Sequence, residues 1–183
     1  DDLVRQRRIS YVSDISFLQS SLELINSSVD KLSGVFDYGA SQGFYLEEFI
    51  RSGVSNAFGW DYGTHATQVL KEKSFFLDIF EQNSPYFQLL TLRGVIEHIL
   101  NPFELVPNLV DKINPDFIYL SATPNGSSIC SHLYRQNWRM HVPKEHLWHF
   151  SPHHLVKLFS RSGYCLLNLG YPYVGTPYED LSA

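Results

Sequence analysis

Short apolar runs alternate with segments of helical periodicity along most of this chain. Six of these runs are expected to form strands, at residues 34–38, 57–60, 75–77, 88–92, 117–120 and 165–169. Runs that are apolar almost throughout are typical of strands covered on both faces, and the segments between them suit crossover helices. The pattern predicts an α/β fold with a Rossmann-like, doubly wound, mostly parallel sheet and helices on both faces.

The helices carry their own signals. An apolar face at helical spacing precedes the first strand and consists of Ile15, Leu18, Leu22 and Ile25. Residues 1–33 are therefore expected to form a helical segment that flanks the sheet. Two later helices start at a cap residue followed by proline, at Asn101-Pro102 and at Ser151-Pro152. The last helix is expected to end at Gly163.

Composition indicates one soluble domain spanning residues 1–183. The 183 residues are 44% hydrophobic, which is enough for a core without disulfides, and the net charge of -5 gives no basic stripe for a nucleic acid. No apolar run approaches the roughly 20 residues that span a bilayer, and no signal peptide is evident. Cys130 and Cys165 lack metal-ligand spacing. We therefore expect a cytoplasmic protein without a membrane partner.

Two segments depart from the alternation. Residues 123–150 form an irregular stretch that is long for a compact domain, and such loops are commonly functional lids. The tail from residue 171 to 183 is rich in aromatic residues and proline and shows no clear strand. It could supply an irregular last strand at residues 171–178, or the chain could stop short of one.

Polar and glycine residues follow the predicted strands. In an open parallel sheet, ligands bind beyond the carboxyl ends of the strands, where the strand order reverses. The segment 37–43 combines an aspartate with glycines at a strand-to-helix turn, and Asp61 follows the next strand. A carboxylate in that place can accept both hydroxyls of a ribose. Asp78 and residues 93–98 are expected at the same edge.

These residues resemble the motifs of class I S-adenosylmethionine-dependent methyltransferases. The run Asp37-Tyr-Gly-Ala-Ser-Gln-Gly43 is similar to the D-x-G-x-G-x-G motif, with Ser41 in place of the middle glycine. The second and third motifs are matched by Gly59-Trp-Asp-Tyr62 and Leu77-Asp78. The resemblance implies S-adenosylmethionine as cofactor, bound by Asp37, Gly39, Ser41, Gly43, Asp61, Tyr62, Asp78, Ile79, Arg93 and Gly94.

Later signatures resemble the ubiquinone-type, small-molecule branch of this group. They are Leu92-Arg-Gly-Val-Ile-Glu-His98 with Asn101-Pro102, then Thr123-Pro-Asn125, and Glu145-His146 leading to Phe150-Ser151. The resemblance covers residues 34–170 as a cofactor-binding core. It implies methyl transfer to a small-molecule oxygen, nitrogen or carbon, with the acceptor bound under residues 123–150. His98 and His146 are the candidate catalytic residues, since a hydroxyl acceptor must lose its proton.

Histidines and tryptophans gather in and just after the irregular stretch, at His132, Trp138, His141, His146, Trp148, His149, His153 and His154. They could form an acceptor lid, or the tryptophans could cover the sheet edge while the histidines face water. Glu97, His98, His146 and His149 are also ligand types that Zn²⁺ accepts. Small-RNA 2′-O-methyltransferases resemble this arrangement and use a metal, but they carry Glu-x-x-Glu-His, where this chain has Gly94. We therefore assign no metal to the site, and whether one binds near Glu97, His98 and His146 stays open.

Three alternatives remain beside the leading interpretation. A catalytically silent, methyltransferase-like binding module within a larger protein would fit Ser41 and the absent starting methionine. A nicotinamide-dependent oxidoreductase would need G-x-G-x-x-G, whereas the glycines here read Gly39-x-x-x-Gly43. An RNA acceptor is disfavoured because an acidic chain releases few counterions. The oligomeric state and the identity of the acceptor stay open.

Overall fold

Four parallel strands form the sheet of this protein. The structure, a computed structural model, describes residues 2–81 and 85–173. The strands are β1 (Val35–Tyr38), β2 (Ala57–Trp60), β3 (Leu89–Arg93) and β4 (Phe117–Ser121), and their order is β2-β1-β3-β4. Every pairing is parallel. The predicted Rossmann-like α/β fold is confirmed, with the strand order reversing between β1 and β3.

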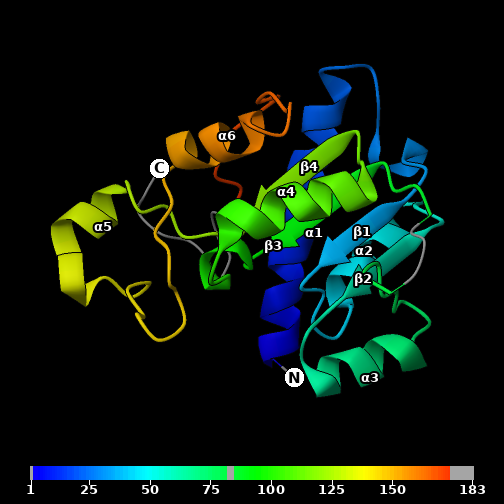
Figure 1. The fold of residues 1–183 in the computed structure, drawn as a ribbon, viewed down its shortest axis with the longest axis horizontal. Helices are drawn as coiled ribbons and strands as arrows, with labels where there is room; N and C mark the ends of the chain where they lie inside the picture. The colour runs from blue at the N-terminus through cyan, green and yellow to red at the C-terminus, as the bar shows by residue number, and fades with distance from the viewer. Residues whose placement is uncertain (1, 82–84, 174–183) are drawn as a thin grey trace.

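Helices cover both faces of this sheet (Figure 1). The α-helices are α1 (Asp2–Glu23), α2 (Phe44–Arg51), α3 (Thr64–Glu72), α4 (Pro102–Ile113), α5 (Ile129–Tyr134) and α6 (Pro152–Ser160). Short 3₁₀ turns are η1 (Val29–Lys31), η2 (Ile96–His98) and η3 (Arg135–Asn137). Figure 1 shows α4 in front of the sheet and α1 behind it, while α5 projects at the side.

The strand sequences explain the two layers, because successive side chains of a strand point to opposite faces. Val35 and Leu89 pack with α1, α2 and α3, whereas their neighbours Phe36 and Leu90 pack with α4. All four side chains are fully buried. On the α1 side the predicted face is correct for three of its four residues, since Ile25 lies beyond the helix and is 42% exposed.

Two predicted strands are wrong or reduced. Residues 75–77 make a single parallel bridge, between Gly59 and Phe76, beside β2. Residues 165–169 form no strand, and Leu166, Leu167 and Leu169 stay 55%, 42% and 52% exposed. A strand needs a neighbour to pair its backbone groups, and the described residues provide none there. Residues 171–173 are not a strand either, and residues 174–178 of the predicted irregular strand lie outside the described residues.

The predicted helix starts are confirmed in position. Ser151 caps α6 through a capping box, in which its side chain accepts from the backbone N–H of His154. Asn101 makes no such bond at α4; its amide donates instead to Glu104 Oε2 at 2.9 Å. The helix α6 ends at Ser160, before Gly163. None of the helices in the described ranges is long and apolar enough to cross a membrane.

Candidate functional site

The loops that follow β1 and β3 meet where the strand order reverses. Gly39 follows β1 and has φ of 81°, and Gly94 follows β3 and has φ of 59°. A Cβ on Gly39 would lie 2.4 Å from Cγ2 of Val95, so these two loops touch and only glycine fits at position 39. Parallel α/β sheets bind their ligands at such a point. The strand order therefore agrees with a ligand site at the carboxyl ends of the strands, as predicted.

Three residues of the loop after β1 have a left-handed backbone conformation. Besides Gly39, Gly43 has φ of 77° and Ser41 has φ of 49°. A left-handed conformation costs a residue with a Cβ about 1–2 kcal/mol. Ser41 has such a conformation, so serine at this position is strained relative to the glycine of the motif.

Asp61 is tied to this loop. Its Oδ2 accepts a hydrogen bond from the backbone N–H of Ser41 at 2.9 Å, and its Oδ1 accepts one from that of Gly63 at 2.8 Å. The carboxylate is half-buried at the end of β2. The structure thus brings Asp61 and residues 39–43 together.

Asp37 lies beneath the loop and not on its surface. Its side chain is 3% exposed, and Thr91 Oγ1 on β3 donates to its Oδ1 at 2.6 Å. Burial is the largest influence on this carboxyl and raises its pKa from 3.8 to about 7. Asp37 therefore lies beneath the loop as a buried acid.

Three further residues predicted to bind the cofactor, Tyr62, Asp78 and Ile79, differ in exposure. Tyr62 is 89% exposed, whereas Ile79 is fully buried in the core. Asp78 accepts a hydrogen bond from the backbone N–H of Phe80 at 2.9 Å. The side chain of Ile79 packs in the cluster on the α4 side, so of this residue only the backbone could contact a ligand without rearrangement.

Arg93 leads away from the loops into the interface with α1. Its Nε donates to Asp14 Oδ2 at 2.7 Å, and its guanidinium lies over the ring of Tyr11 at 4.4 Å. Asp14 is fully buried and also accepts from the hydroxyls of Tyr119 and Tyr173. Burial raises the pKa of Asp14, and Arg93 opposes that shift. In this structure Arg93 serves as the counterion of Asp14.

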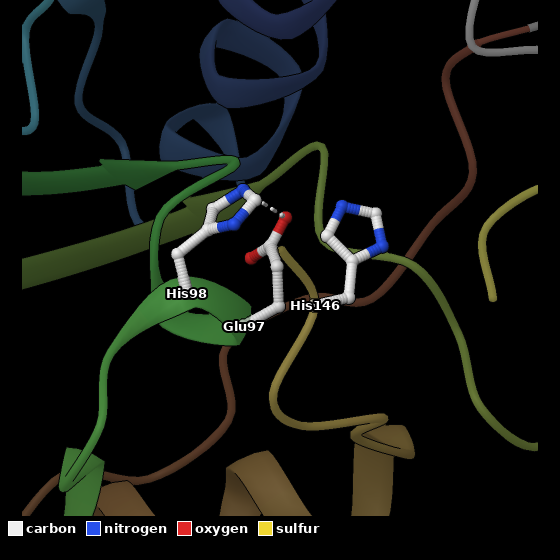
Figure 2. A group of neighbouring side chains, drawn as sticks. All are labelled: Glu97, His98 and His146. Atoms are coloured by element: carbon white, nitrogen blue, oxygen red, sulfur yellow. Dashed lines mark ion pairs between the residues drawn. The ribbon is translucent and has the colours of Figure 1, made fainter. Parts of the chain in front are cut away.

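A second group of polar side chains lies at the loop after β3. Glu97 is flanked by the imidazoles of His98 and His146 (Figure 2). Oε1 of Glu97 lies 3.8 Å from Nε2 of His98, and the two imidazole centroids are 4.9 Å apart. Glu97 is 2% exposed, and burial, the largest influence, raises the pKa of its carboxyl. The two candidate catalytic histidines are therefore neighbours.

Backbone contacts bring His146 to this place. The carbonyl oxygen of Glu97 accepts from the N–H groups of Leu147 at 2.8 Å and Trp148 at 3.2 Å. The indole of Trp148 donates to the carbonyl of Ile99 at 2.9 Å. The end of the irregular segment is thereby fixed on η2, with His146 beside Glu97.

The irregular segment, residues 123–150, contains α5 and η3. The positions of its tryptophans and of the nearby histidines bear on whether they form a lid or cover the sheet edge. Trp138 is 5% exposed, and Trp148 is half-buried and packs against the core beside Phe150. Four of the six histidines are exposed, at His132, His141, His153 and His154. The expectation that histidines face water holds for these four, whereas His146 and His149 are half-buried.

A cavity of about 540 Å³ opens next to Glu97, His98 and His146. Its walls are formed by α1, β4, α6 and residues 164–173, and its lining is mostly apolar, including Phe17, Tyr119, Trp138 and Phe159. Residues 39–43 and Asp61 do not line it. The cavity therefore lies apart from the loop after β1, although Arg93 and Gly94 line it, and residues 123–125, 138, 140 and 146 contribute one part of its wall.

Fold and site together define an α/β protein with a glycine loop, an acidic residue after β2 and a polar group facing a cavity. The chain belongs to the family described as "Methyltransferase domain", whose sequence pattern matches residues 15–169. The resemblance stated from the motifs is thereby confirmed. A comparison with curated proteins gave no match.

Solved methyltransferase structures share the fold. The plantazolicin methyltransferase BpumL, in complex with a pentazolic desmethylPZN analog and SAH, is 17% identical over 82% of this chain and 62% of its own, with a TM-score of 0.59. Magnesium protoporphyrin IX methyltransferase from Synechocystis with bound SAH is 13% identical over 90% and 78%, with a TM-score of 0.62. The chain thus spans less than two thirds of the BpumL chain.

The methyltransferase domain of bacterial CtHen1 is a third similar structure. It is 16% identical over 83% of this chain and 85% of its own, with a TM-score of 0.57. At these identities the likeness concerns the fold. The roles of individual residues have to be argued from the site itself.

Proposed function

We propose that this chain transfers the methyl group of S-adenosylmethionine to an oxygen, nitrogen or carbon atom of a small-molecule acceptor. The observation that carries the proposal is that two sets of residues follow the carboxyl ends of neighbouring parallel strands, in loops that touch at Gly39 and Val95. Residues 39–43 with Asp61 form the first set, and Glu97, His98 and His146 beside the cavity form the second. Methyl transfer needs both sides, one for the cofactor and one for the acceptor.

The residues of the first set fit the cofactor by their chemistry. The carboxylate of Asp61 can exchange the amides of Ser41 and Gly63 for the two hydroxyls of a ribose. Glycine at position 39 permits close approach of the backbone. Asp37 can ionise when a positive charge is bound above it, since its pKa is about 7. These contacts support a cofactor-binding role for residues 37–43 and Asp61, within the proposed cofactor-binding core of residues 34–170.

The second set supports proton removal from the acceptor. When bound, S-adenosylmethionine supplies a methyl group on a positively charged sulfur. The ring Nδ1 of His98 donates to the carbonyl of Glu145, and that of His146 donates to the carbonyl of Met140, each at 2.7 Å. Each Nε2 therefore carries a lone pair that can take a proton. The acceptor loses that proton, its bond to the methyl carbon forms, and the carbon–sulfur bond breaks, leaving a neutral thioether.

The apolar cavity favours an acceptor with a substantial hydrophobic part. Its volume of about 540 Å³ lies within the usual range for small-ligand sites. We propose that residues 123–150 act as the lid over this acceptor. A cytoplasmic location, which we also propose, suits Cys130 and Cys165 as separate free thiols.

A catalytically silent binding module is the second candidate. The left-handed backbone of Ser41, at φ of 49°, favours it because the strained serine stands where the motif has glycine. Binding of the cofactor without turnover on any acceptor would then be observed.

Calorimetric titration with S-adenosylhomocysteine, the demethylated product, tests the cofactor side, with NAD as the comparison ligand. We expect binding of the former alone. Asp61→Ala should weaken it at least about tenfold, which is about 1.4 kcal/mol. Asp111→Ala, at an exposed carboxylate of α4, is the matched control and should bind like the wild type.

Two results would contradict the proposal. One is tighter binding of NAD than of S-adenosylhomocysteine. The other is undiminished binding by Asp61→Ala in a folded protein. Because Asp61 also holds the amides of Ser41 and Gly63, Asp61→Asn serves as a second variant that keeps an oxygen for one of them.

A further inference from the structure

Glu97 is a buried carboxylate without a firm counterion. Its side chain is 2% exposed, and its only ion-pair contact among the described residues is Nε2 of His98, at 3.8 Å from Oε1. Oε2 accepts a hydrogen bond from Thr123 Oγ1 at 3.2 Å. Removing a carboxylate from water without a countercharge costs several kcal/mol. A cation or a proton is therefore needed at Oε1.

The other buried carboxylates of the described residues have cationic or hydrogen-bonding partners of other kinds. Asp14 pairs with Arg93 at 2.7 Å, and Glu48 pairs with two arginines at 2.7 and 2.5 Å. Asp37 accepts from a threonine hydroxyl and has no imidazole beside it. Glu97 differs from all three, because two imidazoles converge on it and no arginine or lysine pairs with it.

The imidazoles are held in the orientation that a metal ligand needs. Nδ1 of His98 lies 2.7 Å from the carbonyl oxygen of Glu145, and Nδ1 of His146 lies 2.7 Å from that of Met140. A carbonyl oxygen only accepts, so each Nδ1 carries the hydrogen and each Nε2 presents a lone pair. Histidines that bind metals are fixed by this same contact of the second ring nitrogen.

We propose that Glu97, His98 and His146 bind a divalent first-row transition ion, of the Zn²⁺ or Co²⁺ type, through one carboxylate oxygen and two Nε2 atoms. The candidate ligand atoms lie within 4.8 Å of one another. Bonds of about 2.1 Å in a tetrahedral site place ligand atoms about 3.4 Å apart. Binding an ion therefore requires the ligand atoms to approach one another by at most about 1.4 Å, the difference between these two separations.

The donor set decides the type of ion. Two imidazoles and one carboxylate suit zinc, cobalt and similar ions, whereas Mg²⁺ prefers oxygen ligands and retains water. Three protein ligands leave a position open toward the cavity, as in catalytic metal sites. An ion there would lower the pKa of a hydroxyl in the open position.

This site narrows the acceptor class, an extension that rests on the proposed methyl transfer. With both Nε2 atoms on an ion, His98 and His146 act as ligands, and the acceptor is an oxygen nucleophile such as an alcohol or a phenol. Its proton leaves to solvent as the oxygen–methyl bond forms and the carbon–sulfur bond breaks. Amine and carbon acceptors gain less from such a site, because the ion favours an anionic oxygen.

The test is a Co²⁺ titration of the chelator-treated full chain, followed by visible absorption, with Zn²⁺ and Mg²⁺ titrated by calorimetry. We expect one Co²⁺ per chain and no comparable binding of Mg²⁺. His146→Ala and Glu97→Gln should each weaken Co²⁺ binding by at least about 100-fold. His153→Ala, at an exposed histidine of α6, is the control and should bind as the wild type does.

Co²⁺ binding that survives both substitutions overturns the proposal, and so does the absence of binding to the wild type. If Glu97→Gln fails to fold, His146→Ala carries the test, because His146 is only half-buried. Titration of the same metal-free protein with S-adenosylhomocysteine separates the two proposals. Cofactor binding without Co²⁺ binding overturns the metal site alone, and Co²⁺ binding without cofactor binding overturns the methyl transfer alone.

Discussion

Replacing Asp37 by asparagine tests whether the carboxyl beneath the glycine loop is held as a neutral acid. The side chain is 3% exposed, and burial raises its pKa from 3.8 to about 7. In the unfolded chain the same carboxyl ionises near its ordinary value. Between the two pKa values, folding therefore takes up a proton, and the free energy of unfolding falls as the pH rises.

The magnitude follows from the two pKa values. Their difference is about three units, and each unit corresponds to about 1.4 kcal/mol, so the wild type should lose about 4 kcal/mol between pH 4 and pH 7 through this group. The loss is absent below 3.8 and complete above about 7. Asparagine keeps an oxygen for the hydroxyl of Thr91 and cannot ionise, so Asp37→Asn should escape this loss.

Urea unfolding of both proteins from pH 4 to pH 8 measures the effect. The difference in the free energy of unfolding, variant minus wild type, should rise by about 4 kcal/mol across this interval and then level off. Asp111→Asn, at an exposed carboxylate on α4, should show no such rise. A difference that stays constant over the whole interval would refute the assignment of Asp37 as a buried neutral acid.

Three further substitutions test other parts of the structure, each by urea or thermal unfolding. Arg93→Met should cost about 3–5 kcal/mol because it leaves the carboxylate of Asp14 buried without its partner, and adding Asp14→Asn should restore much of the loss. Ser41→Gly should raise stability by about 1 kcal/mol by relieving the left-handed backbone. Gly59→Ala should cost about 1–3 kcal/mol, since its Cβ would lie 2.5 Å from that of Ala40. Unchanged stability in any of these variants would contradict the contact or the backbone strain that the substitution tests.

The sheet could be predicted because each of its strands is marked by a local pattern in the sequence. Each of β1 to β4 is a short apolar run followed by a turn, and the parallel crossovers then place all carboxyl ends at one edge. The meeting of Asp61 with the loop at Ser41 follows from that topology. Residues 165–169 show the limit, because an apolar run becomes a strand only when a neighbour pairs with its backbone.

Arg93 shows why the direction of a side chain is harder to predict than the position of a residue. The end of β3 fixes where its Cα lies, at the edge predicted for the cofactor. Its long side chain, however, turns to the buried carboxylate of Asp14 on α1, a residue that no motif distinguishes. The signal available in the sequence was a single aspartate within the apolar face of a helix, and a buried aspartate requires a partner.

In the sequence, Gly94 in place of a glutamate was the reason to assign no metal. The structure shows that three other ligand side chains come together without it. With φ of 59°, position 94 favours glycine, so the backbone itself disfavours a glutamate there. The remaining three side chains converge without a ligand at position 94. Their convergence depends on backbone bonds from Leu147 and Trp148 to the carbonyl of Glu97, which no local pattern reveals. A buried carboxylate, two oriented imidazoles and an open cavity then make a bound cation the arrangement that satisfies all three.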